Sequence, residues 1–291
     1  MSTGERVDPR DRDHELRTLI EIAMRASQLV MEVYATDFTV EMKGPSDPVT
    51  RADREANTLI CEALAEAFPD AAVVAEESAP EDPAELARLL SHERVFFVDP
   101  IDGTREFADK NGEFAVMIGL AVGGVAEVGV VTVPVLGHVL FGRVGRGAYR
   151  DTGGGSPLEQ LRVTDLSDPT RARAVVSRSH RSARLVPILE RLGVTNEITC
   201  GSVGLKVARV VTGDADLYVH PTRGAKKWDA CAPAAILHAA GGRFTDLDGN
   251  DIDYRATELS LERGIAVTND ALHDAVIAAS RGVMGPPEMG R

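Results

Sequence analysis

Apolar residues recur at helical spacing over the first part of the chain. After Asp13, a residue type that often caps helices, they follow the i, i+3, i+4 pattern as far as Tyr34. A second pattern of this kind runs from about residue 52 to 68 and carries Asp53 in its first turn. The polar stretch "KGPSDP" between them predicts a loop. We therefore predict two amphipathic helices, each with an apolar face that must cover a sheet.

Short β-rich runs follow, separated by turns that contain glycine. They lie at residues 71–75, 94–98, 114–122, 126–134, 138–144 and 147–150. Runs of this length with short connections predict an antiparallel sheet. The glycine-rich stretch "DTGGGSP" after the last run predicts the tip of a hairpin.

Strand-like and helix-like patterns alternate in the rest of the chain. Strands are predicted at 172–177, near 197, at 215–219 and at 264–268, and helices at 182–192, 203–212, 230–240 and 270–281. Such alternation is typical of α/β structure. We therefore expect an α/β (α+β) fold in two halves. Residues 13–165 form the half with the antiparallel sheet, and residues 166–282 form the half in which strands and helices alternate.

Composition limits the possible partners. With 291 residues, 44% of them hydrophobic, the chain can bury a substantial core. The formal net charge is -13 and no segment concentrates Lys and Arg, which argues against binding to a nucleic acid polymer or an anionic membrane. A small anionic substrate stays compatible with this charge, because bound divalent cations can reverse the sign inside one cleft.

Cysteine usage and the N-terminus indicate the compartment. Cys61, Cys200 and Cys231 are odd in number and form no CxxC motif, which favours reduced thiols in the core of a cytosolic protein. The N-terminal stretch is charged and lacks the apolar segment of a secretion signal, and no segment is long enough to span a membrane. We expect a soluble, cytoplasmic protein.

Two aspartates close together, in "VDPIDGTREF", are the first candidate for chemistry. Asp99 and Asp102 follow an apolar strand, and Pro100 between them interrupts the pairing of that strand. Like charges this close repel each other unless they share a cation. Their oxygen ligands, with the Ile101 carbonyl between them, select Mg²⁺, Mn²⁺ or Ca²⁺ over zinc. Taken alone, an Asp-x-x-Asp is more often an Asx turn that caps a helix.

Further acidic residues stand at the ends of other predicted elements. Glu76 and Glu77 end the apolar run "VVAEES", and Asp229 begins a helix beside the only tryptophan. Each has an ordinary explanation, as a solvated strand end or as a helix cap. Together with Asp99 and Asp102, they predict a set of carboxylates able to hold divalent cations.

These motifs carry a resemblance to a known family. Asp53 in "DPVTRAD", Glu76 in "AEES", the "DPIDGT" run and "WDACAPAAIL" are similar, in order and approximate spacing, to the signature of the lithium-sensitive, magnesium-dependent phosphatases of the inositol monophosphatase family. The similarity covers about residues 14–281. It implies a layered α-β-α-β-α sandwich whose first half binds two or three Mg²⁺ ions and whose second half binds the substrate.

The resemblance also implies residue roles. By this resemblance, Glu76, Asp99 and the Ile101 carbonyl bind the first metal ion. Asp99, Asp102 and Asp229 bind the second. Glu76, Asp53 and Thr104 fall in the catalytic set, where Thr104 and Asp53 assist the water that attacks the phosphate in line. Physical chemistry agrees, since cations held about 4 Å apart by carboxylates activate a water and stabilise the leaving alkoxide. No Ser or Cys nucleophile is then needed.

Three stretches of the second half resemble one subgroup of that family. "SRSH", "SVGLK" and "GAKKWDACAPAAILHAAGG" are similar to the 3'(2'),5'-bisphosphate nucleotidases of the CysQ type, which remove the 3'-phosphate of 3'-phosphoadenosine 5'-phosphate. The substrate-binding residues implied are Gly103, Thr104, Ser177, His180, Ser202 and Lys206. From the residues alone, the amides that begin the helix near 203 could receive an anion, while a surface histidine and a solvated lysine are the ordinary explanations of His180 and Lys206.

The segment before "WD" bears on the choice of substrate. Inositol monophosphatases carry an acidic residue there to bind inositol hydroxyls, whereas this chain has "HPTRGAKKWD", with Thr222 and Lys226. These residues argue against inositol. A homodimer is common among the relatives that the sequence resembles.

The sequence thus predicts a Mg²⁺-dependent phosphomonoesterase acting on a small phosphorylated substrate, 3'-phosphoadenosine 5'-phosphate, with a role in clearing a by-product of sulfur assimilation. One alternative is an inositol monophosphatase or a broad sugar phosphatase such as a fructose-1,6-bisphosphatase. Another is a non-catalytic sensor of metal or nucleotide.

Overall fold

The structure is a computed structural model that describes residues 8–44, 47–179 and 181–285. Its helices are α1 His14–Tyr34, α2 Arg51–Ala67, α3 Pro83–Leu90, α4 Thr104–Ala108, α5 Leu185–Leu192, α6 Val203–Val211, α7 Lys227–Ala239 and α8 His273–Ser280. Its strands are β1 Glu41–Gly44, β2 Asp47–Val49, β3 Ala72–Ala75, β4 Arg94–Asp102, β5 Ala115–Val122, β6 Val125–Val133, β7 His138–Arg143, β8 Gly147–Asp151, β9 Glu159–Leu161, β10 Arg173–Ser177, β11 Asn196–Cys200, β12 Leu217–His220, β13 Gly242–Thr245 and β14 Ile265–Asn269.

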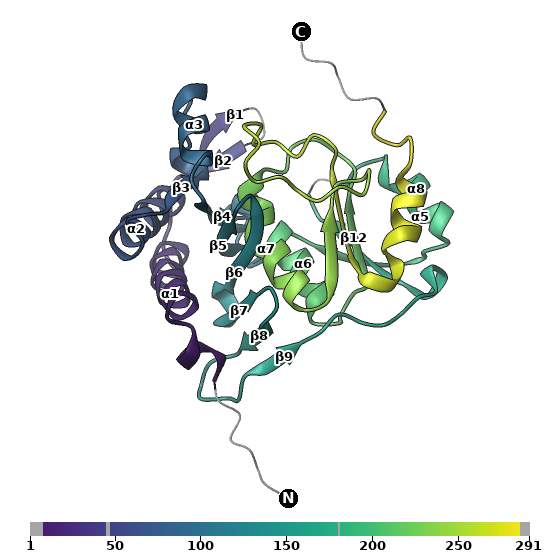
Figure 1. The fold of residues 1–291 in the computed structure, drawn as a ribbon, viewed down its shortest axis with the longest axis horizontal. Coiled ribbons are helices and arrows are strands. Elements are labelled where there is room, and N and C mark those ends of the chain that lie inside the picture. Colours follow the sequence, from purple (N-terminus) through teal and green to yellow (C-terminus); the bar gives the residue numbers. More distant parts are fainter. Residues whose placement is uncertain (1–7, 45–46, 180, 286–291) are drawn as a thin grey trace, which may run out of the picture.

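Helices and sheets alternate in five layers (Figure 1). Helices α1 and α2 cover one face of a seven-stranded sheet, and α6 and α7 lie between its other face and a five-stranded sheet. Helices α5 and α8 cover the far side of the five-stranded sheet. Apolar residues fill each of the boundaries between these layers, because every face of sheet or helix that carries apolar side chains has a partner. The predicted α-β-α-β-α sandwich is confirmed.

The two N-terminal helices form where their sequence patterns predict. The carboxylate of Asp13 accepts a hydrogen bond from the Leu16 amide at 3.1 Å, so it caps α1. At the start of α2, Thr50 and Asp53 make a capping box, in which the Thr50 amide donates to Asp53 Oδ2 at 2.7 Å. This box fixes Asp53 at the edge of the layer, beneath the end of β4.

The seven-stranded sheet has the order β3-β4-β5-β6-β7-β8-β9. The pairs from β4 to β9 are antiparallel, as predicted, but β3 and β4 run parallel. A parallel pair needs a crossover, and α3, which the sequence analysis did not identify, lies within it. Because Ala75 pairs with Val98, the next residues along both strands emerge side by side at one edge of the sheet.

Strand β4 extends past the predicted end at residue 98. Its pairing with β5 is irregular between Asp99 and Asp102, so Pro100 interrupts the ladder without ending the strand. The segment predicted as a loop before α2 instead contains the short antiparallel pair β1 and β2. Strands β9 and β13 were also missed; both are short. The predicted hairpin tip lies between β8 and β9.

The five-stranded sheet has the order β11-β10-β12-β14-β13. Strand β10 runs parallel to both β11 and β12, whereas β14 is antiparallel to its neighbours. The parallel strands direct their carboxyl ends, with Ser177 and His220, toward the same edge.

Helix α7 lies directly on the seven-stranded sheet. A Cβ at Gly119 would come within 2.4 Å of the Ala232 nitrogen, and one at Gly129 within 2.1 Å of the Ala232 oxygen. Only glycine permits this close approach of helix backbone to strand. The contact places the first turn of α7, with Asp229, at the ends of β3 and β4.

The cysteines lie in or near the core. Cys200 and Cys231 are buried and Cys61 is half-buried, and all three are free thiols. Within the described ranges, no helix combines the length and the apolar character that crossing a membrane requires.

Candidate active site

A pocket of about 670 Å³ is lined by residues of both sheets and of helices α6 and α7. The ends of β3 and β4 and the first turn of α7 form one wall, and β10, α6 and β12 contribute to the other. Four predicted carboxylates line it: Glu76, Asp99, Asp102 and Asp229. Residues that are far apart in the sequence therefore meet in one place.

The fold explains why these acids meet. Glu76 directly follows β3 and Asp99 lies on β4, and the parallel pairing of the two strands brings these residues to the same edge. Asp229 stands at the third position of α7, where its Oδ2 accepts a hydrogen bond from the Lys226 amide at 2.7 Å. Its capping role and its place in the pocket are thus compatible.

Burial and neighbouring negative charges disfavour ionisation of the carboxyls in the pocket. Burial raises the pKa of Asp99 well above its usual range, and the charges of Glu76, Asp102 and Asp229 raise it further. Burial likewise raises the pKa of Glu76 to about 7 and that of Asp229 to about 8. Asp99 and Asp229 also share a hydrogen bond. Such a group of oxygen ligands fits a hard divalent cation, which would take the place of the protons.

Lys43, which the sequence analysis did not single out, reaches the acids from β1. Its Nζ lies 2.9 Å from Glu76 Oε1 and 2.6 Å from Glu77 Oε1. Burial lowers the pKa of Lys43, but the two glutamates outweigh this effect and leave it raised. The carboxylates Glu76, Asp99, Asp102 and Asp229 make up the acid wall of the pocket, and the Lys43 ammonium group neutralises part of its charge.

Across the described residues, no three Asp, Glu, His or Cys side chains are grouped as ligands of one metal ion. Two of the four carboxylates are engaged by other groups. Lys43 holds Glu76, and Asp102 is turned toward the start of α6. Cation binding on this wall requires these side chains to exchange partners.

Asp102 makes a dense set of hydrogen bonds with the opposite wall. It accepts from the Gly204 amide at 2.6 Å, from the Val203 amide at 3.0 Å and from the Ser202 hydroxyl. The α6 amides were predicted to be able to receive an anion. The anion that the Val203 and Gly204 amides bind is a carboxylate of the protein itself, that of Asp102.

The backbone at this contact is tightly constrained. Ser202 has a φ of 52°, in the left-handed region that non-glycine residues rarely adopt. A Cβ at Gly204 would lie 2.6 Å from Met117 Sδ. The close fit of α6 against β5 thus depends on a glycine.

Thr104 links the end of β4 to α2. Its hydroxyl lies 3.0 Å from Asp53 Oδ1 and 3.0 Å from the Ile101 carbonyl oxygen, and with one hydrogen it donates to one of them at a time. Burial raises the pKa of Asp53, while hydrogen bonds from Thr50 and Thr104 oppose this shift. The predicted Thr and Asp pair is in contact, and Thr104 faces the pocket.

Gly103 joins β4 to α4 with a φ of 97°. A Cβ there would lie 2.9 Å from the Glu113 carbonyl oxygen, so both conformation and space require glycine. Gly103 lines the pocket beside Thr104.

Three other predicted substrate residues lie on the opposite wall. Ser177, Ser202 and Lys206 line the pocket, and His180 lies outside the described residues. Lys206 is buried and its Nζ donates to the Ser202 carbonyl oxygen at 2.9 Å. Burial lowers the pKa of Lys206.

The pocket has further lining residues that sequence reasoning missed: Arg105, Tyr218, His220 and Arg223. Tyr218 and His220 are two residues apart on β12, so their side chains lie on the same face of the sheet, and both residues line the pocket. This alternation in "LYVH" was the available signal, but the pattern alone did not show which face meets the site.

Thr222 and Lys226 also line the pocket; Thr222 Oγ1 lies 2.9 Å from His220 Nε2, and Lys226 contacts the Ser260 hydroxyl.

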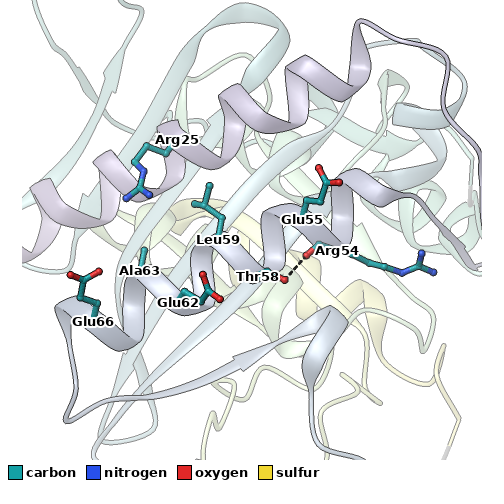
Figure 2. A pocket seen from close by; sticks show the side chains of 8 residues that line it. All are labelled: Arg25, Arg54, Glu55, Thr58, Leu59, Glu62, Ala63 and Glu66. Atoms are coloured by element: carbon teal, nitrogen blue, oxygen red, sulfur yellow. Dashed lines mark hydrogen bonds between the residues drawn. The ribbon is translucent and has the colours of Figure 1, made fainter.

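A second hollow, of about 560 Å³, lies between α1 and α2 on the outer surface (Figure 2). Figure 2 shows Arg25 from α1 facing a row of α2 residues that includes Glu62 and Glu66. None of the predicted site residues lines it. Charged residues of both signs along two helices are typical of a solvated surface.

Comparison with known proteins agrees with this site. The family model of the inositol monophosphatase family matches residues 11–284. The 3'(2'),5'-bisphosphate nucleotidase CysQ of Salmonella typhimurium is 36% identical over 87% of this chain and 99% of the relative. Human 3'(2'),5'-bisphosphate nucleotidase 1 is 30% identical over 80% of this chain and 83% of the relative.

Solved structures show the same architecture. The crystal structure of CysQ from Bacteroides thetaiotaomicron, described as a bacterial member of the inositol monophosphatase family, has a TM-score of 0.75 and 28% identity, covering 88% of this chain and 97% of its own. An IMPase of Thermotoga maritima has a TM-score of 0.76 and 26% identity, covering 93% of this chain and 98% of its own. With the family model matching nearly the whole chain, and with four carboxylates from three separate segments meeting in one pocket, this protein belongs to the inositol monophosphatase family.

Proposed function

We propose that the protein is a Mg²⁺-dependent phosphomonoesterase that hydrolyses the 3'-phosphate of 3'-phosphoadenosine 5'-phosphate. The observation that carries the proposal is the meeting of Glu76, Asp99, Asp102 and Asp229 at one pocket. The similarity to proteins named 3'(2'),5'-bisphosphate nucleotidase, over most of both chains, supports the choice of substrate. By-product clearance in sulfur assimilation would be its role.

The acid wall would hold two or three Mg²⁺ ions. Glu76, Asp99 and the Ile101 carbonyl would bind the first, and Asp99, Asp102 and Asp229 the second. The raised pKa values of Glu76 and Asp229 support this, since crowded buried carboxyls bind a divalent cation in place of protons. When bound, Mg²⁺ neutralises charge on the phosphoryl group and activates water.

The contact between Thr104 and Asp53 would orient the attacking water. With its hydrogen directed to Asp53 Oδ1, the Thr104 hydroxyl oxygen is free to accept a hydrogen bond from that water. The burial that raises the pKa of Asp53 suits a carboxylate that receives a proton through this hydroxyl. Phosphoryl transfer depends mainly on such positioning and on charge.

The opposite wall would bind the rest of the substrate. We assign Ser177, His180, Ser202 and Lys206 to the nucleotide and its 5'-phosphate, and Gly103 and Thr104 to the reacting phosphate. This assignment divides the chain between a metal-binding half, residues 13–165, and a substrate-binding half, residues 166–282, which adds one metal ligand, Asp229. Lys206 supports it, because it brings a cation to the pocket without a carboxylate hydrogen-bonded to its Nζ.

The segment before Trp228 supports a nucleotide over inositol. Thr222 and Lys226 line the pocket there, and neither carries the acidic group that would accept hydrogen bonds from inositol hydroxyls. We also propose a cytoplasmic location and a homodimer, both by analogy with the family.

Phosphate release measured on a small panel tests the proposal. The purified protein is given equal concentrations of 3'-phosphoadenosine 5'-phosphate, inositol 1-phosphate and fructose 1,6-bisphosphate, with Mg²⁺ or with EDTA. We expect the highest kcat/KM for the nucleotide and no release in EDTA.

Two outcomes would contradict this. Faster turnover of inositol 1-phosphate or of the sugar bisphosphate would show that the substrate assignment is wrong while the metal site remains in place. Binding of the nucleotide without any phosphate release, on every member of the panel, would point to a non-catalytic sensor.

A further inference from the structure

Tyr218 has a buried hydroxyl group without a hydrogen-bond partner. The residue lies on β12, is 1% exposed and lines the pocket. Among the residues that the structure describes, none accepts from or donates to its hydroxyl oxygen. Because an unpaired buried hydroxyl costs free energy, its retention in a binding pocket calls for a partner that binds there.

The two acidic groups whose charges act on the Tyr218 phenol are already hydrogen-bonded. Asp102 accepts hydrogen bonds from Val203 and Gly204 amides and from the Ser202 hydroxyl. Asp229 accepts from the Lys226 amide and shares a hydrogen bond with Asp99. The Tyr218 hydroxyl is thus left over after the protein's own acceptors at this site have been used.

The ring of Tyr218 lies beneath the cation of the same wall. Lys206 Nζ is 5.3 Å from the ring centroid, within the range of a cation–π contact. The ammonium is also fixed by its hydrogen bond to the Ser202 carbonyl oxygen. The lysine and the phenol are therefore neighbours that can contact one anion together.

We propose that Tyr218 is a phosphate-binding residue, whose hydroxyl donates a hydrogen bond to an oxygen of the non-reacting phosphate that Lys206 binds. This deepens the proposed function and rests on it for the identity of the nucleotide. A phosphate monoester suits the site, because it offers several strong acceptor oxygens and two negative charges to a donor and an ammonium group.

The protonation state of the phenol agrees with a donor role. Burial raises the pKa of Tyr218, and the charges of Asp102 and Asp229 raise it further. The hydroxyl therefore keeps its hydrogen at every physiological pH. A deprotonated phenol would instead repel the phosphate.

Tyr254 offers a matched control. It is also buried, at 3% exposed, and its hydroxyl likewise has no partner among the described residues. It packs against Phe97 with ring centroids 5.3 Å apart and does not line the pocket. Removing either hydroxyl should relieve the same kind of unpaired group, but only Tyr218 lines the pocket.

The experiment compares Tyr218→Phe and Tyr254→Phe with the wild-type protein. Without ligand, we expect both variants to melt higher, by about 2–4 °C, because an unpaired buried hydroxyl is gone. In calorimetric titration with adenosine 5'-phosphate in Mg²⁺, Y218F should bind about tenfold more weakly, and Y254F should bind as the wild type does. The KM of Y218F for 3'-phosphoadenosine 5'-phosphate should rise by a similar factor, with kcat within about twofold.

Unchanged binding of adenosine 5'-phosphate by Y218F would overturn the proposal. So would a lower melting temperature for Y218F with no loss of affinity, since the hydroxyl would then bind a buried water that stabilises the fold. If the wild-type protein binds no adenosine 5'-phosphate, the nucleotide assignment fails by itself. The same comparison with inorganic phosphate then still tests the hydroxyl, because that anion carries the proposed acceptor without a nucleoside.

Discussion

The two walls of the pocket handle charge in opposite ways. On the acid wall, Glu76, Asp99 and Asp229 crowd together, and burial and mutual repulsion raise the pKa of each. On the facing wall, polar groups bond to nearby parts of the same wall. Lys206 donates to the Ser202 carbonyl oxygen, and the Leu205 amide donates to the Ser202 hydroxyl.

This difference indicates which wall needs a ligand to be stable. On the facing wall, Ser202 and Lys206 have hydrogen-bond partners within the protein, whereas the Tyr218 hydroxyl has none among the described residues. The acid wall carries repulsion that only protons, the Lys43 ammonium or a divalent cation can relieve. Asp102 belongs to the acid wall by position, yet helix α6 supplies its hydrogen bonds, so it connects the two.

Neutralising the most buried acid should have the largest effect. Asp99→Asn keeps the size of the side chain and an acceptor for the Ile101 amide, but removes the charge that two proposed metal sites share. We expect phosphate release at saturating substrate to fall more than about 100-fold, since even outer-shell changes at metal sites cost 10–100-fold. Without metal, the variant should melt higher than the wild type at pH 8, because repulsion is relieved.

Asp70→Asn, on an exposed turn, serves as the control and should change neither quantity. An Asp99→Asn enzyme with near-normal turnover would contradict the assignment of the acid wall to metal binding.

The acid wall was largely predictable because its signals are local. An aspartate or glutamate directly after an apolar strand, as at Glu76 and Asp99, is visible in a short stretch of sequence. Their convergence was not visible in this way. It depends on the parallel pairing of β3 and β4 and on the glycine-dependent seating of α7, which are contacts between distant segments.

The facing wall was harder to predict for a physical reason. The start of α6 has the pattern of an open anion site, but which anion occupies it is decided by Asp102, about a hundred residues earlier in the chain. Lys43 lies in a short polar segment without periodicity, so its place over Glu76 left no local signal. The fold itself does not decide the substrate either, since CysQ and IMPase neighbours match it about equally well.

A substitution at Gly204 tests the connection between the walls. In Gly204→Ala the new Cβ would meet Met117 Sδ at 2.6 Å and Asp102 Oδ2 at 3.3 Å. We expect the free energy of unfolding to fall by about 1–3 kcal/mol, the usual range for overpacking. Denaturant titration measures this change.

The reason for that loss can be checked with a double variant. If the clash with Met117 dominates, the added cost of Gly204→Ala should shrink in a Met117→Ala background. An equal cost in both backgrounds would show that displacement of Asp102, rather than the sulfur contact, destabilises the protein.

Removing the Lys43 ammonium group should increase the affinity of the acid wall for Mg²⁺. In Lys43→Met, Glu76 and Glu77 lose their partner, so Mg²⁺ no longer competes with it. We expect Mg²⁺ to bind roughly three to tenfold more tightly in calorimetry without substrate, a change of about 1 kcal/mol, which is typical of a partly exposed ion pair. Arg54→Met, which removes an exposed ion pair with Glu41, is the control. Weaker Mg²⁺ binding by Lys43→Met would instead mean that Lys43 supports the metal-bound arrangement.

The smallest predicted effect is the pH dependence of stability. Its sign follows from the raised pKa values of the carboxyls on the acid wall. The pKa values of Glu76 and Asp229 are about 7 and about 8, whereas unfolded carboxyls titrate near 4. The folded protein therefore binds more protons than the unfolded chain between about pH 4 and 8, and its free energy of unfolding falls as the pH rises through that range. Two groups act in the opposite direction, because burial lowers the pKa of His273 to about 4 and that of Lys227 to about 8. The interval pH 7–8 avoids the effect of His273, and there the two carboxyls outweigh the single lysine.

In EDTA, we expect the melting temperature to fall by about 2–4 °C from pH 7 to 8, the effect of releasing about one proton. Saturating Mg²⁺ should abolish the decline, because bound cations keep the carboxyls ionised at both pH values. Asp229→Asn should reduce the decline in EDTA, whereas an Asp70→Asn control should keep it. A melting temperature that rises with pH in EDTA would show that the acid wall is not protonated when metal is absent. The charge on that wall would then have to be balanced by Lys43 and hydrogen bonds alone.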